Sequence, residues 1–198
     1  MLNRRHIRIK VLQAFYAFSQ SNNDDLRKGI NEFNLSINKT YDLYIYLIQI
    51  FIPLKRCANI KIEESKRSFL EKEDISFSKS FVDNQVIHQI ESSKLLEKVV
   101  NDSKISWVGD VENDLVKKLF KAIYNSESYQ EILVAENKSF ENQKLSIIKL
   151  FKEEICNYDL LHHFFDEKSI YWQDDLDHVS SMIIKTLKSI KENEDLVL

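Results

Sequence analysis

Only two glycines and one proline occur among the 198 residues of this chain, and this scarcity limits the possible folds more than any other feature. β-Hairpins, sandwiches and barrels need these residues at their many tight turns. Hydrophobic residues make up 43% of the sequence, which is enough to build a buried core. The composition therefore predicts an all-α protein folded as a multi-helix bundle.

The same scarcity argues against common enzyme motifs. Walker loops, dinucleotide fingerprints and Gly-x-Ser-x-Gly elbows need closely spaced glycines, whereas Gly29 and Gly109 stand far apart. His162 and His163 are adjacent, so on a helix they point about 100° apart and do not converge on a metal. The acids at 174–178 are explained more simply as the first turn of a helix. We predict a protein without catalytic activity, cofactor or metal.

Cysteine content and hydropathy point to the cytoplasm. Cys57 and Cys156 form neither a Cys-x-x-Cys pair nor a disulfide framework, which favours a reducing compartment. The basic start lacks the small-residue cleavage site of a signal peptide, so we expect it to belong to the mature protein. The most apolar stretch, 41–54, falls short of the roughly 20 residues of a membrane span. We expect a cytoplasmic protein that does not enter a membrane.

Positive charge is concentrated at the beginning of the chain. The first 20 residues contain Arg4, Arg5, Arg8 and Lys10 but no Asp or Glu, although the whole chain has a formal net charge of −3. A basic end on an acidic body is typical of proteins that contact nucleic acid or an acidic surface. The alternative is a terminus that is simply solvated and frayed.

This basic segment has helical spacing. One stripe starts with arginines and becomes apolar, through Arg4, Arg8, Val11, Phe15 and Phe18. We expect its apolar part, with Leu12, to pack on the core, whereas an unpaired arginine is too costly to bury. The first two turns should then overhang the body and present Arg4, Arg5 and Arg8 to phosphates and base edges. Alternatively, these arginines pair with acids of a neighbouring helix.

Apolar residues recur at steps of three and four from Leu26 to Phe51, which predicts one long helix or two nearly collinear helices. Pro53 predicts a kink or a helix end nearby. The stretch 41–51 is apolar almost all round, so we expect it at the centre of the bundle. Its tyrosines could stack on bases, but a helical aromatic stripe more often belongs to a core.

A charged segment divides the chain. We expect an N-terminal helical region at 1–70, a linker at 71–80 and a C-terminal helical region at 81–198, packed separately or as one domain. Trp107 and Trp172 each precede an aspartate at an expected helix start, which suggests a shared cap and aromatic staple. Later helices are expected at 81–100, 111–125, 127–136, 139–156, 157–166 and 174–192.

The segment Asn3-Arg-Arg-His-Ile-Arg-Ile-Lys-Val-Leu-Gln-Ala-Phe-Tyr16 resembles the opening helix of the NusB family of bacterial transcription antitermination factors. There an Arg-Arg-x-x-Arg cluster precedes a Leu-Gln-x-Leu-Tyr run, matched here by Arg4, Arg5, Arg8, Leu12, Gln13, Phe15 and Tyr16. A weaker likeness runs from Lys144 to Lys188. The family's closing segment, with Ile-Asn-Glu and Phe-x-Asn-Gly, is absent, so we expect either the front of a longer protein or a divergent short version.

The resemblance implies a function for the basic end. NusB proteins bind the single-stranded boxA element of ribosomal RNA transcripts together with NusE, a small-subunit ribosomal protein, in the RNA polymerase antitermination complex. Carried over, the RNA-binding residues are Arg4, Arg5 and Arg8, with Lys10 on the same helix and Tyr16 close to this surface. The expected function is NusB-like, non-enzymatic RNA binding. The alternative is a helical protein–protein interaction module without RNA binding, marked by an exposed apolar patch on the order of several hundred Å².

Overall fold

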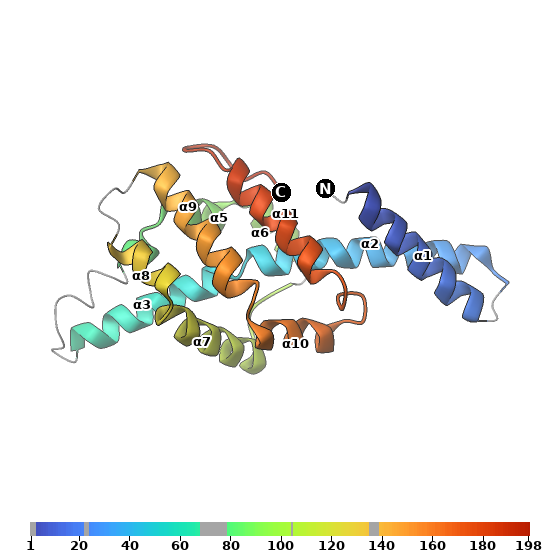
Figure 1. Cartoon of the computed structure of the whole chain (residues 1–198), viewed down its shortest axis with the longest axis horizontal. Helices are drawn as coiled ribbons and strands as arrows, with labels where there is room; N and C mark the ends of the chain where they lie inside the picture. Colours follow the sequence, from blue (N-terminus) through green and yellow to red (C-terminus); the bar gives the residue numbers. More distant parts are fainter. Residues whose placement is uncertain (1–2, 22–23, 68–78, 104, 135–138) are drawn as a thin grey trace.

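The computed structural model describes residues 3–21, 24–67, 79–103, 105–134 and 139–198. Every secondary-structure element in these ranges is helical, which confirms the predicted all-α multi-helix bundle (Figure 1). Most of the predicted linker, 71–78, lies outside the described residues. The elements are α1 (Arg4–Gln20), α2 (Leu26–Ile48), α3 (Phe51–Arg67), α5 (Gln85–Ser92), α6 (Lys94–Ser103), α7 (Asp110–Tyr124), α8 (Glu127–Val134), α9 (Phe140–Leu150), the π-helical turn η1 (Phe151–Ile155), α10 (Asp159–Lys168) and α11 (Leu176–Ser189).

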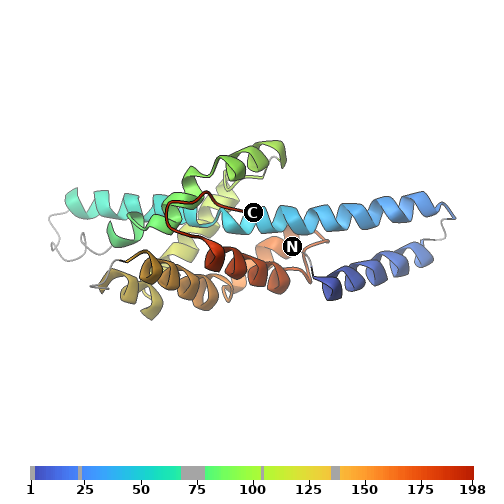
Figure 2. The same cartoon turned by 90° about the horizontal axis from the view of Figure 1, so that it is seen from above.

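Helices α2 and α3 form the long axis of the molecule. They follow one another in nearly the same direction, with a break at Gln49 and Ile50 (Figure 2). This confirms the alternative of two nearly collinear helices with an interruption near Pro53. The proline itself lies in the first turn of α3, where the N–H group that it lacks would have no partner within the helix.

The central stretch of α2 lies in the core, as its apolar composition predicts. Leu43, Ile45, Leu47 and Ile48 are completely buried. Helix α11 packs on α2, while α5 and α7 pack on α3. Residues from both sides of the predicted linker belong to one continuous hydrophobic core, so the two predicted regions are joined by shared packing.

Both tryptophans attach the bundle to α2. Trp107 Nε1 donates a hydrogen bond to the backbone oxygen of Tyr46 at 2.8 Å, and Trp172 Nε1 donates to that of Lys39 at 2.7 Å. These carbonyls lie about two helical turns apart, on the same side of α2. The suggested shared cap does not form, because the carboxylate of Asp175 makes no capping bond to α11. It contacts α1 and α2 instead.

One helix expected from the sequence is divided in the structure. The helix predicted at 81–100 is divided at Ser93, whose extended backbone (ψ 109°) separates α5 from α6. The Ser93 hydroxyl accepts a hydrogen bond from the backbone N–H of Leu96 at 3.2 Å and so begins α6. Periodicity does not reveal this break, because the apolar spacing continues across it.

Helix α1 and the beginning of α2 form an arm that extends from the bundle. The two helices lie side by side and run in opposite directions, so that the end of α1 and the beginning of α2 lie at the far end of the arm (Figure 2). The first turns of α1 are near α11, and its later turns lie beside α2, away from the other helices. The arm therefore has one face toward α2 and the body, and a second face toward solvent.

Candidate functional site

The buried side of α1 is polar, contrary to expectation. Its buried residues are His6 and Lys10, whereas Val11, Leu12 and Phe15 are exposed. The prediction that the apolar part packs on the core is therefore wrong. The predicted overhang is also reversed, because the first turns of α1 lie against the body and the later turns extend away from it (Figure 2).

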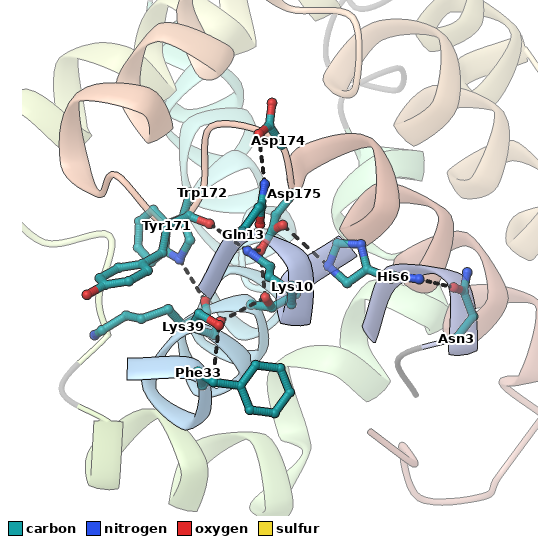
Figure 3. Close-up of polar contacts among 12 residues, drawn as sticks. Asn3, His6, Lys10, Gln13, Phe33, Lys39, Tyr171, Trp172, Asp174 and Asp175 are labelled. Carbon is teal, nitrogen blue, oxygen red and sulfur yellow. Dashed lines mark hydrogen bonds and ion pairs between the residues drawn. The ribbon is translucent and has the colours of Figure 1, made fainter. Parts of the chain in front are cut away.

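Asp175 explains why polar residues of α1 are buried. Its carboxylate, which is 1% exposed, lies 2.8 Å from Lys10 Nζ and accepts a hydrogen bond from Thr40 Oγ1 at 2.6 Å (Figure 3). The second carboxylate oxygen lies 3.3 Å from His6 Nε2. Lys10 Nζ also donates to the backbone oxygen of Tyr171 at 3.2 Å. His6, Lys10, Thr40 and Asp175 form a polar junction between α1 and the body. Because a buried charge requires a partner, this junction determines which side of α1 faces the body.

Two histidine rings complete the junction. His6 stacks on His178 of α11, with ring centroids 3.9 Å apart and ring planes at 5°. Burial lowers the pKa of His6, Lys10 lowers it further, and Asp175 opposes both effects. Burial likewise lowers the pKa of His178, with further lowering from His6 and Lys185. The two rings therefore stack most favourably when both are neutral.

Three further polar contacts lie around the junction, and Figure 3 shows the two that involve α1. Asn3 Oδ1 accepts a hydrogen bond from a backbone N–H of the first turn at 2.7 Å and so determines where α1 begins. Gln13 Nε2 donates to Asp174 Oδ2 at 3.2 Å, and the Tyr171 hydroxyl donates to Glu32. These contacts place Asp174 on the side of α1 that faces the body.

The outward face of α1 carries the arginines. Arg4, Arg5 and Arg8 are exposed, and none of them forms an ion pair with another residue in the part of the chain that the structure describes. Within the described residues, the structure therefore contradicts the alternative that these arginines pair with acids of a neighbouring helix. The N–H donors of these guanidinium groups are therefore available to a ligand.

Aromatic and aliphatic side chains continue this face along the helix. Phe15 is 67% exposed and Tyr16 is 65% exposed, about two helical turns after Arg8. Helical spacing places the exposed residues in two adjacent stripes. The first consists of Arg4, Arg8, Val11 and Phe15, and the second of Arg5, Ile9, Leu12 and Tyr16.

A shallow groove lies between α1 and α2 on the arm. It has a volume of about 190 Å³ and is lined by Val11, Ala14, Phe15, Phe18, Leu26, Gly29, Ile30 and Phe33. A Cβ atom at Gly29 would come within 2.9 Å of the Phe18 ring, so glycine permits the two helices to approach closely here. The arm thus leaves apolar surface uncovered next to its basic end.

The structure separates the predicted site residues into two groups. Arg4, Arg5, Arg8 and Tyr16 share the outward face, whereas Lys10 is buried in the junction and is paired with an acid. Lys10 therefore positions α1 and is not available to a ligand while α1 is docked.

Sequence reasoning did not find the residues that hold α1 against the body. Neither His6 nor His178 belongs to an apolar stripe, and the sequence pattern places Asp175 only at a helix start. A signal was present, because a lysine and a histidine at helical spacing lay on the opposite side from the arginines. Their acidic partner, Asp175, lies near the other end of the sequence and could not be deduced from one chain.

Other features of the described residues bear on chemistry. Within them, no group of three or more His, Cys, Asp or Glu side chains is placed to hold a metal ion. Burial raises the pKa of the Cys57 and Cys156 thiols, which disfavours the nucleophilic thiolate. His162 Nε2 lies 2.6 Å from the backbone oxygen of Cys156 and is thus engaged locally. None of the described helices combines the length and the apolar character needed to cross a membrane.

Comparisons with protein-family models, with curated proteins and with solved structures give no match to this chain. Functional inference therefore depends on the geometry of α1 and on the motif in its sequence. The outward face of α1 combines exposed cations with exposed aromatic rings, and this combination suits a ligand that has both negative charge and flat apolar surfaces.

Proposed function

We propose that this chain is a non-enzymatic RNA-binding protein of transcription antitermination, and that Arg4, Arg5 and Arg8 bind single-stranded RNA of the boxA type. Its proposed partners are NusE, the small-subunit ribosomal protein, and the RNA polymerase antitermination complex. Two observations support the proposal. Residues 3–16 resemble the opening helix of NusB, and the matching arginines are exposed on one helix face.

The exposure of three arginines without acidic partners among the described residues carries the proposal. Nearby acids do not neutralise them, because Asp175 binds Lys10 and Asp174 binds Gln13 on the opposite side of α1. Guanidinium groups bind phosphate oxygens through paired, charge-assisted hydrogen bonds. A single strand also exposes unstacked bases, whereas an RNA duplex hides its base edges in a deep, narrow groove.

Fluorescence anisotropy tests this proposal directly. A labelled boxA-like RNA and a scrambled RNA are titrated with the protein at several salt concentrations, with and without NusE. We expect tighter binding to the boxA-like RNA and a log–log salt slope of about −2, since three neutralised phosphates on a single strand release about that many counterions. Replacing Arg4, Arg5 and Arg8 together by Ala should abolish both the preference and the slope.

A matched variant controls for loss of positive charge. Lys98, Lys117 and Lys121 are exposed on α6 and α7, and their joint replacement by Ala removes the same charge from the body. We expect this variant to bind RNA like the unmodified protein. Equal losses in both variants would show unspecific attraction to net charge, and undiminished binding by the arginine variant would refute the proposal.

A second candidate function is a helical protein–protein interaction module, favoured by the apolar groove of the arm. Leu26 and Ile30 of α2 are exposed together with Val11 of α1, and contiguous apolar surface of this kind often marks a protein interface. This second function applies if the unmodified protein binds NusE but no RNA, and substitution of Ile30 by Asp tests whether the groove is the interface. It should leave RNA affinity intact if the arginines bind RNA, and should abolish NusE binding if the groove is the NusE interface.

A further inference from the structure

Charged and aromatic side chains follow one another in a fixed order along the outward face of α1. Each of its two stripes begins with arginine and ends with an aromatic ring, Arg4 and Arg8 before Phe15, and Arg5 before Tyr16. Both rings are about two-thirds exposed, although the apolar stripe predicts that Phe15 packs on the core. Exposed aromatic rings on a regular helix lose the burial that normally stabilises them, so a ligand that covers them gains that energy.

We infer that Phe15 and Tyr16 stack on unpaired bases, so that the outward face of α1 is a track for single-stranded RNA. The inference depends on the proposed RNA-binding function and adds to it the residues that select single strands. The arginines bind the phosphates, and the two aromatic rings stack on the bases.

The dimensions of α1 are compatible with such a track. Phe15 follows Arg8 by seven positions in the sequence, which corresponds to about 10 Å along a helix. A strand held at Arg8 therefore passes the ring within a few nucleotides. Stacking on an aromatic ring requires an unstacked base, which a duplex does not offer, and each stacked base adds binding energy irrespective of sequence.

The charge of this face favours RNA over a protein partner. Arg4, Arg5 and Arg8 lie on the same side as both rings, and no acid occurs in the first 20 residues. A purely apolar partner would leave the guanidinium groups uncompensated at the edge of the interface. A polyanion with flat apolar bases satisfies both parts of the surface.

Substitutions at Phe15 test the track. The probe is a short uridine-rich RNA containing one 2-aminopurine, whose fluorescence falls when the base stacks. We expect Phe15→Ala to weaken binding roughly tenfold, within the range known for base–aromatic stacking, and to reduce the quenching of 2-aminopurine. The salt slope should stay unchanged, because no phosphate contact is removed. Phe15→Trp should restore affinity and quenching, whereas Phe15→Leu should not.

Two controls separate this inference from the proposed function. Leu26→Ala removes another exposed apolar side chain of the groove and should leave RNA binding unchanged. If Phe15→Ala and Phe15→Leu bind like the unmodified protein while the triple arginine variant does not, the stacking inference is overturned, the proposed function stands, and the apolar face is left for a protein partner. If the arginine variant also binds normally, both fail.

Discussion

The two halves of α2 have the same apolar spacing but opposite surroundings. In the half that belongs to the arm, Leu26 is 65% exposed and Ile30 is 50% exposed, whereas Leu43 and Leu47 in the other half are completely buried. Steps of three and four residues predict a helix in both halves. The spacing gives the helix but not the partner that covers its apolar face, and this difference separates the arm from the core.

The strongest test of the comparison is a truncation in the buried half. Leu47→Ala should lower the free energy of unfolding by roughly 2–5 kcal/mol, because it leaves a cavity in a tightly packed core. Chemical denaturation followed by circular dichroism measures this. A loss below about 1 kcal/mol would contradict the central position of this half of α2.

The second test concerns the junction that holds the arm. Asp175→Asn removes the counter-charge of buried Lys10 and should weaken the docking of α1 by roughly 1–3 kcal/mol, the cost of an unsatisfied buried donor. Release of α1 limits this cost, since Lys10 then regains water. Hydrogen exchange should rise in α1 and remain low in α9. The matched variant Asp174→Asn alters one exposed contact to Gln13 and should leave exchange unchanged; equal protection in both variants would refute the role of Asp175.

The third test uses pH. Burial holds the pKa values of His6 and His178 below the ordinary value of 6.5, so the unfolded chain takes up protons first as the pH falls. The stabilising contribution of the neutral stack is complete above about pH 6.5 and decreases as the pH falls from there toward the lowered pKa values. Asp175 opposes this effect, whereas Lys10 and Lys185 strengthen it.

Hydrogen exchange of α1 at about pH 7.5 and 5.5, corrected for the intrinsic rate, measures the effect. Protection should fall at the lower pH, and His178→Asn should reduce the difference. His88→Asn changes an exposed histidine on α5 and should keep it. An equally large pH dependence in His178→Asn would show that other titrating groups cause the loss of protection.

The smallest effect is expected in the exposed half of α2. Leu26→Ser removes an apolar side chain that makes little contact, so the free energy of unfolding should change by no more than about 0.5 kcal/mol. Denaturation under the conditions used for Leu47→Ala gives a direct comparison. A cost above about 2 kcal/mol would mean that Leu26 is buried in solution, for example by self-association, which analytical ultracentrifugation would detect.

Local patterns predicted the elements but not the way α1 docks. The scarcity of glycine indicated an all-α fold, and the apolar run at 41–51 correctly placed the middle of the bundle. The outward position of Arg4 and Arg8 was also predicted, since lone guanidinium groups resist burial. Burial of His6 and Lys10 was missed, because it depends on Asp175, which is close only in the folded chain.

An NMR titration of the isotope-labelled protein with single-stranded boxA-like RNA tests the central claim most directly, since it maps the contact residue by residue. The account predicts that backbone amide shifts change mainly in α1, around Arg4, Arg5 and Arg8 and on to Tyr16, while the amides of α7 and α9 stay in place. Shift changes confined to other helices, or no changes at RNA concentrations that saturate binding, would contradict the assignment of the RNA-binding surface to α1.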